Sequence, residues 1–401
     1  MIEPNLLNSS VWGHLLREGK NEYIPLNVAE LQFPAATPIR EELACLAQTG
    51  AYGYTETFDD FPRLVHDWCL RRHGWEVNMD LVVMVPRVVH LLALIAREYF
   101  PAPPTVVTMS PQYSPTLEVL KRNGCAIRTS RLVEEDGVWS VDPANLKSAL
   151  FGADMLLLCS PHNPTGTVWP RHELEQIARM CKAAGVMVVS DEVHCDSVRY
   201  GTHTPFALVA EAGQEWISCI APGKAFNLAG LETSAVVCSR NEISQWLRRA
   251  LRRAGFHNAN IFGLRAMQIA WSKCDEWLDR TQLELQASFN VACEVLRQEL
   301  PGLRPVPAGG TFLLWIDARS VGGEDMLRKW FVREAKVIPA FGSDFGEEYS
   351  GWLRLNLGIP RERLDEVLRR LVSTAPIAAR SKMSSPRSPA SSHSRGPAHT
   401  D

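Results

Sequence analysis

Four polar side chains of different chemistry follow short apolar runs in the middle of this sequence. They are the amide of Asn163 in SPHNPTG, the carboxylate of Asp191 and the imidazole of His194 in SDEVHCD, and the amine of Lys224 in APGKAFN. Each alone has an ordinary structural role: the asparagine in a turn, the aspartate as a cap, the histidine in the core, the lysine in an exposed loop. Four such groups at neighbouring strand ends instead favour a shared site.

Together these groups match the needs of pyridoxal 5′-phosphate (PLP). The amine of Lys224 can form a Schiff base with the cofactor's aldehyde. The carboxylate of Asp191 can keep the pyridine nitrogen protonated, which makes the ring an electron sink. An amide and an imidazole can hydrogen-bond the phenolic O3′. We therefore predict a PLP site centred on Lys224.

The pair Gly223–Lys224 also raises the possibility of a Walker A phosphate loop. That motif needs a glycine where Ser218 stands and a serine or threonine where Ala225 stands. Both positions fail, so the sequence excludes a phosphate loop of this type.

The elements that must position these groups are short apolar strands alternating with amphipathic helices. Strands are predicted over 104–110, 153–160, 185–192 and 216–222. The stretch 171–185 has the periodicity of a helix. This alternation indicates an α/β fold with a mostly parallel sheet between helices, and ligands of such sheets bind at the carboxyl ends of the strands.

After residue 240 the sequence is helical for some distance and then forms a smaller α+β region. That region includes a predicted strand over 309–319 and a closing helix over 361–373. The last stretch is rich in Ser, Pro and Arg, a composition typical of disorder. The predicted division is an N-terminal segment of the small domain (1–50), a large PLP-binding domain (51–270), a C-terminal small domain (271–374) and a disordered tail (375–401).

Several motifs over residues 22–372 resemble those of one enzyme family. SPHNPTG, SDEVHCD, GKAFNLAGLETSAVV and LRLNLG are similar to segments of fold-type I PLP enzymes of the class I/II aminotransferase superfamily. Within it, the sequence most resembles the MalY/PatB-type cystathionine β-lyases, also called cysteine-S-conjugate C–S lyases. The resemblance implies a fold-type I PLP-dependent transferase fold.

The resemblance implies roles for individual residues of the cofactor site. Lys224 would carry the cofactor as a Schiff base and then act as the base at the substrate Cα. Asp191 would pair with the pyridine nitrogen, while Asn163 and His194 would lie near O3′. Tyr113, in SPQYSP, would stack on the cofactor ring.

Further roles concern the phosphate, the substrate and a second subunit. The backbone amides of Val88 and Val89, which open a helix, would bind the phosphate. Tyr54 would reach the phosphate of a neighbouring subunit, so the resemblance implies a homodimer with a shared active site. Arg354 would hold the carboxylate of the amino-acid substrate by a bidentate contact, with Asn163 beside it.

Three departures from the family pattern concern the active site. Glu232 stands where many aminotransferases have an arginine for the phosphate, and this favours a lyase. Ala221 and Gly223 replace serines that often donate to the phosphate. AELQF (29–33) replaces an acidic entry motif of the DMDF type.

The expected activity is PLP-dependent C–S β-elimination, in which an S-substituted cysteine gives a thiol, pyruvate and ammonia. Two alternatives use the same four residues: transamination, and decarboxylation-coupled oxidative deamination of an S-cysteinyl conjugate. A non-enzymatic regulator on the same fold is disfavoured, because Lys224 is present and no DNA-binding module is added.

Composition limits the partners and the compartment. The net charge is -3 without a basic stripe, which argues against nucleic acid or a membrane surface as a partner. No secretory signal or membrane span is predicted, and ten scattered cysteines indicate a reducing cytoplasm and no metal site. The excess of Arg over Lys is typical of a GC-rich bacterial genome, and we expect a role in sulfur-containing antibiotic or other secondary-metabolite biosynthesis.

Overall fold

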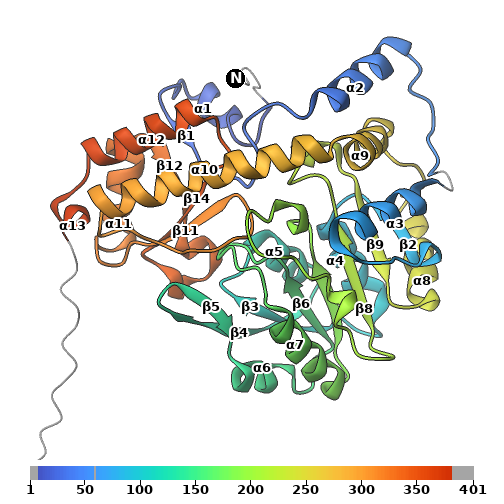
Figure 1. Cartoon of the computed structure of the whole chain (residues 1–401). Helices are drawn as coiled ribbons and strands as arrows, with labels where there is room; N and C mark the ends of the chain where they lie inside the picture. The colour runs from blue at the N-terminus through green and yellow to red at the C-terminus, as the bar shows by residue number, and fades with distance from the viewer. Residues whose placement is uncertain (1–7, 58–59, 382–401) are drawn as a thin grey trace, which may run out of the picture.

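An eight-stranded sheet forms the centre of the molecule (Figure 1), in a computed structural model that describes residues 8–57 and 60–381. The strand order is β2-β9-β8-β7-β6-β3-β4-β5. The five strands from β8 to β4 run parallel, whereas β2, β9 and β5 pair antiparallel with their neighbours. The strands are β2 (Val82–Val85), β3 (Thr105–Ser110), β4 (Ala126–Glu135), β5 (Val138–Val141), β6 (Met155–Cys159), β7 (Met187–Asp191), β8 (Trp216–Ile220) and β9 (Ser234–Cys238). The α/β class and the parallel centre of the sheet are as predicted.

Helices cover both faces of this sheet, which explains why its strands are apolar throughout. Leu156 and Leu158 of β6 pack into a cluster with residues of α6 and α7. Met155 and Leu157, which point the other way, pack into a cluster with residues of α4 and α8. The helices of this unit are α3 (Asp60–His73), α4 (Val88–Leu94), α5 (Ser114–Arg122), α6 (Pro143–Leu150), α7 (Arg171–Ala184), α8 (Asn241–Arg253) and α9 (Ile261–Lys273).

A second, smaller unit follows the long helix α10 (Asp275–Glu299), drawn in orange in Figure 1. Its four-stranded antiparallel sheet has the order β10-β11-β14-β13. The strands are β10 (Arg304–Pro305), β11 (Leu313–Asp317), β13 (Ala340–Phe341) and β14 (Trp352–Asn356), and the helices are α11 (Glu324–Arg328) and α12 (Arg361–Ser373). The predicted strand over 309–319 and helix over 361–373 are β11 and α12.

The N-terminal segment is divided between the two units. After the short helix α1 (Gly13–Arg17), β1 (Ile24–Pro25) pairs in parallel with β12 (Val337–Ile338) of the smaller unit. Helix α2 (Thr37–Thr49) instead packs against α9 of the larger unit. The segment between them contributes Val28, Ala29 and Glu30 to the lining of the cavity described below, which places N-terminal backbone beside the strand ends.

Part of the segment expected to be disordered is folded in the structure. Residues 377–380 form a short helix, α13 (Ile377–Arg380), and Ala379 is fully buried. The carbonyl of Ala379 accepts a hydrogen bond from the Gly302 amide at 2.9 Å. The expectation of disorder from residue 375 is therefore corrected for residues 375–381, and its remainder, 382–401, lies outside the described residues. Among the described helices, none combines the length and apolar character needed to cross a membrane.

Candidate active site

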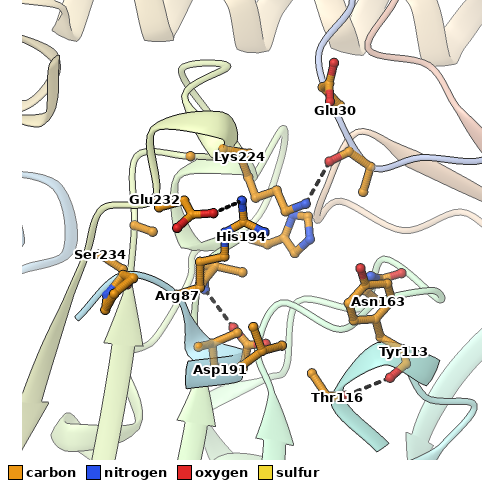
Figure 2. A pocket seen from close by; sticks show the side chains of 18 of the residues that line it. Glu30, Arg87, Tyr113, Thr116, Asn163, Asp191, His194, Lys224, Glu232 and Ser234 are labelled. Atoms are coloured by element: carbon orange, nitrogen blue, oxygen red, sulfur yellow. Dashed lines mark hydrogen bonds and ion pairs between the residues drawn. The ribbon is translucent and has the colours of Figure 1, made fainter. Parts of the chain in front are cut away.

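One cavity opens at the carboxyl ends of the parallel strands, and the predicted cofactor residues lie around it (Figure 2). Its lining includes seven of the nine residues singled out from the sequence: Lys224, Asp191, Asn163, His194, Tyr113, Val88 and Val89. Asp191 is the last residue of β7, and the others follow β6, β7, β8, β2 and β3. The parallel sheet thus brings together residues that are up to 136 positions apart, from Val88 to Lys224, because all these strand ends share one edge.

Lys224 lies in the turn after β8, and its side chain enters the cavity. Its Nζ donates a hydrogen bond to the carbonyl of Ala29 at 2.7 Å. Burial first, and then the positive charge of Arg354, lower the pKa of this amine to about 8, against the opposing effect of Asp191. A substantial neutral fraction near neutral pH makes Lys224 a competent nucleophile and base.

The carboxylate of Asp191 is buried, and few hydrogen bonds compensate for its loss of contact with water. Its side chain accepts one hydrogen bond, from the Val193 amide at a long 3.3 Å. Burial raises the pKa of Asp191 to about 6, which the positive charge of Lys224 only partly offsets. A carboxylate in this setting is stabilised by a protonated nitrogen placed beside it.

Arg354 of β14 reaches the same site from the smaller unit. Its Nη1 donates to Oδ1 of Asn163 at 2.8 Å, and its Nη2 donates to the carbonyl of Asn27. Only 3% of this residue is exposed, and its Nε has no partner among the described residues. Burial lowers the pKa of Arg354 to about 10. No described carboxylate pairs with this buried cation, so an anionic ligand fits beside it.

His194 and Tyr113 complete the polar and aromatic walls. His194 is 4% exposed, and its Nδ1 lacks a hydrogen-bond partner among the described residues. Burial first, and then the charges of Lys224 and Arg354, hold the pKa of His194 well below its usual range, so the ring is neutral. Tyr113 precedes α5, and burial raises its pKa.

Sequence reasoning missed two charged residues that line this cavity, Glu30 and Arg87. Glu30 lies on the segment after β1, and burial raises the pKa of its carboxyl while the charge of Lys224 opposes this. Arg87 lies immediately before α4 and forms an ion pair of 2.7 Å with Glu232, a residue noted from the sequence only as a departure. Arg87 could have been identified from the sequence, because it directly precedes Val88 and Val89, the predicted phosphate-binding residues.

Tyr54 is the predicted residue that the structure leaves outside. Its side chain is 97% exposed and does not line the cavity of its own chain. Arg354 does not line the open cavity either, and it reaches the site through Asn163.

The residues present fit PLP. The weakly bonded carboxylate of Asp191, the amine of Lys224 and His194, whose Nδ1 has no partner among the described residues, line one cavity. Arg354, whose Nε also has no partner among the described residues, is bonded to Asn163 of the same lining. His194 can hydrogen-bond a phenolic oxygen, and Arg354 can bind a carboxylate. Asp191 can pair with a pyridinium, and Lys224 can attack an aldehyde.

The family model for aminotransferase class I and II matches residues 21–371. The chain belongs to this family. The described fold therefore is that of the PLP-dependent enzymes of the aminotransferase class I and II family, as the motifs around Lys224 and Asn163 predicted.

Several relatives that match over about nine tenths of their own length are named cystathionine beta-lyases. Cystathionine beta-lyase PatB of Bacillus subtilis is 32% identical over 358 residues, which cover 88% of this chain and 92% of the relative. Protein MalY of Escherichia coli is 28% identical, with coverage of 89% and 93%. The solved structure of cystalysin from Treponema denticola, which contains PLP, has a TM-score of 0.88 at 27% identity and covers 93% of this chain and 97% of its own.

Proposed function

We propose that this chain is a PLP-dependent carbon–sulfur β-lyase. It converts an S-substituted cysteine and water to a thiol, pyruvate and ammonia. The observation that carries the proposal is the buried guanidinium of Arg354, whose Nε has no partner among the described residues and whose Nη1 is bonded to Asn163 of the cavity that also holds the amine of Lys224. An α-amino acid presents a carboxylate and an acidic Cα proton to these two groups. Similarity to PatB, MalY and cystalysin supports elimination over the other PLP reactions.

When bound, PLP withdraws electrons from the Cα of the attached amino acid and so makes its proton removable. Asp191 would hold the proton on the ring nitrogen, for which a buried carboxylate with one weak hydrogen bond is well suited. Asn163 and His194, whose Nδ1 has no partner among the described residues, would bond the phenolic oxygen. Tyr113, which lines the same cavity, would pack against the ring.

Arg354 and Asn163 orient the substrate. The Asn163 amide oxygen fixes the guanidinium through its 2.8 Å hydrogen bond, which leaves the unpaired Nε free to bind a carboxylate. A substrate fixed at its carboxylate has a defined position for Cα and Cβ relative to Lys224.

Lys224 moves the proton. Its Nζ would take the Cα proton of a substrate held by the cofactor, and a pKa of about 8 suits this role near neutral pH. The Cβ–S bond then breaks with its electron pair going to sulfur, and the leaving thiolate takes up a proton. Water supplies the carbonyl oxygen of pyruvate, and the nitrogen leaves as ammonia.

A product assay tests this proposal. Purified protein with PLP is incubated with cystathionine and a panel of other cysteine S-conjugates, and thiol, pyruvate, aldehyde and new amino acids are quantified together. We expect thiol and pyruvate in equal amounts from at least one conjugate, and neither from Lys224→Ala. A new amino acid formed from an added oxo acid without thiol would show an aminotransferase. An aldehyde with carbon dioxide would show oxidative decarboxylation.

We also propose a homodimer in which Tyr54 serves the partner's site. Its full exposure in one chain supports this, because a second chain is needed to bring it near a cofactor. Mixing Tyr54→Ala and Lys224→Ala chains, each defective alone, should restore up to about a quarter of the sites through mixed dimers. Failure of any mixture to regain activity, with mixed dimers demonstrated, would contradict a shared site.

We propose a cytoplasmic location. We also propose that the domain boundaries lie at about residues 50, 270 and 374. All ten cysteines are free, and eight of them are buried, which supports a reducing compartment. The pairing of β1 with β12 supports an N-terminal segment that is part of the smaller unit.

A further inference from the structure

An ion pair at one side of the cavity has no part in the mechanism above. Nη2 of Arg87 lies 2.7 Å from Oε1 of Glu232, and both side chains are about half exposed. Both residues line the cavity, and Figure 2 shows them on the side away from Asn163 and Tyr113. Arg87 precedes α4, and Glu232 lies between Leu231 and β9 with a left-handed φ of 51°.

The chemistry of the PLP ring indicates what lies on this side. The ring nitrogen and the aldehyde-bearing carbon are opposite each other, and they are assigned to Asp191 and Lys224. The phenolic oxygen and the phosphate arm flank the aldehyde on opposite sides. With the phenolic oxygen toward Asn163, the phosphate arm points away from Asn163, which is the direction of Arg87 and Glu232 (Figure 2).

Few hydroxyl groups are free to hold a phosphate at this end. Ser234 donates its hydroxyl to the Val85 carbonyl at 2.9 Å, and Thr233 donates to the Leu231 carbonyl at 3.1 Å. Ala221 has no hydroxyl. A Cβ at Gly223 would lie 3.3 Å from the Ala229 Cα, so the backbone there resists a serine.

The Arg87 side chain is the cation that remains for this purpose. Its charge acts on the cavity, because it is among the groups that lower the pKa values of Lys224 and Tyr113. A guanidinium binds phosphate oxygens in pairs, and its partner Glu232 holds it by one edge, which leaves donors for another anion.

We propose that Arg87 binds the PLP phosphate and that Glu232 is a positioning residue that holds Arg87 at the cavity. The cation thus stands at the start of α4 instead of at position 232, and it compensates for the missing hydroxyls at 221 and 223. The inference rests on the proposed function only in taking PLP as the cofactor, and it does not depend on which bond of the substrate is broken.

Cofactor binding tests this proposal directly. Apoenzyme is titrated with PLP and, separately, with pyridoxal, which lacks the phosphate, and Kd is measured by fluorescence quenching. We expect Arg87→Gln to raise the Kd for PLP about 10- to 100-fold, the effect of one charge-assisted bidentate contact, and to leave the Kd for pyridoxal within about twofold. Glu232→Gln removes the charge that holds Arg87 at the cavity, so we expect it to raise the Kd for PLP severalfold, by less than Arg87→Gln does, and to leave the Kd for pyridoxal unchanged. An unchanged Kd for PLP in Glu232→Gln would show that Glu232 does not position Arg87.

A charge exchange and a surface control complete the design. The double variant Arg87→Glu with Glu232→Arg keeps the ion pair and a cation at the cavity, so we expect most of the lost PLP affinity to return. Arg122→Gln breaks an exposed ion pair with Glu118 on α5 and should leave both Kd values unchanged.

Two results would overturn the proposal. An unchanged Kd for PLP in Arg87→Gln would show that Arg87 does not bind the phosphate. Equal losses for PLP and pyridoxal would show that the ion pair only supports the fold of the cavity. Neither outcome depends on thiol or pyruvate formation, so this test and that of the lyase function fail independently.

Discussion

Asp191 and Glu192 are adjacent acidic residues at the end of β7, but the hydrogen bonding of their carboxylates is opposite. Glu192 is fully buried and accepts hydrogen bonds from His203, the Phe206 amide and Ser218, at 2.9, 3.1 and 2.9 Å. Asp191 faces the cavity and accepts one bond of 3.3 Å. Burial raises the pKa of Asp191 to about 6. Burial also acts to raise the pKa of Glu192, but its hydrogen bonds, first the one from His203, bring that pKa below its usual value.

The same contrast separates two buried arginines. All three nitrogen groups of Arg199 donate, to the Thr311 carbonyl, Gln286 and the Ala308 carbonyl. Arg354 leaves its Nε unpaired. Saturated polar groups hold the framework, and unsaturated ones mark where a ligand completes the hydrogen bonding. Substitutions in the two sets should therefore separate stability from chemistry.

The largest expected effect is at Lys224. Lys224→Ala removes the nucleophile for the cofactor and the base for Cα, so we expect at least about a 10³-fold loss of turnover. Absorbance spectra should lose the band of lysine-bound PLP, while the unfolding midpoint of the apoenzyme stays the same or rises, because a buried amine has been removed. Turnover within tenfold of the unsubstituted enzyme would refute the assignment.

The paired substitutions Asp191→Asn and Glu192→Gln come next, since they remove the same charge from adjacent residues. Asp191→Asn should lower kcat about 10²- to 10³-fold with an unchanged unfolding midpoint. Glu192→Gln should lower the free energy of unfolding by about 2–4 kcal/mol, because it disrupts a saturated buried network, and keep kcat per folded molecule within a few fold. Urea denaturation and active-site titration measure both. If both variants behaved alike, the contrast between these residues would be wrong.

Lysine substitutions compare the two arginines. Arg354→Lys loses the paired donors for a substrate carboxylate, and we expect KM to rise about 10- to 100-fold. Arg199→Lys should leave KM within about twofold and instead lower the unfolding midpoint. Steady-state kinetics with one conjugate checks this, and an increase in KM for Arg199→Lys as large as for Arg354→Lys would count against the comparison.

The smallest expected effect is a shift in a pH profile. Burial lowers the pKa of Lys224 to about 8, so its neutral, reactive fraction grows as pH rises through 8. The rate of covalent PLP attachment to the apoenzyme should follow this curve. In Arg354→Met the midpoint should move to higher pH by up to about one unit, because a cation that disfavours the ammonium form is removed. A midpoint near the ordinary lysine value in the unsubstituted chain would contradict the role of burial.

Local pattern sufficed for the elements and for the position of the strand ends. Apolar runs predicted β6, β7 and β8 to within two residues at each end, because strands covered on both faces need no polar side chains. The rule that parallel strands share one ligand-binding edge then placed Asn163, Asp191 and Lys224 around one cavity.

Contacts between distant segments could not be predicted in this way. The bond from Arg354 to Asn163 joins residues 191 positions apart, and the pair Arg87–Glu232 depends on where the turn before β9 lies. Sequence also gives no means to tell that the carboxylate of Glu192 is fully hydrogen-bonded, because its donors come from two separate segments, residues 203–206 and Ser218. The tail boundary was misplaced because one buried alanine, Ala379, does not alter the composition of 27 residues.

The packing of α13 against the turn at Gly302 also determines where this chain can be shortened. Gly302 has the Ala378 carbonyl 2.7 Å and the Ala379 Cα 2.9 Å from where a side chain would begin, so the turn after α10 is shaped around this last helix. A truncation after residue 374, chosen from composition, would uncover the apolar end of α12 and deprive the Gly302 amide of its acceptor. A chain shortened for crystallisation should therefore end after residue 381, and a second enzyme should be fused at that same point.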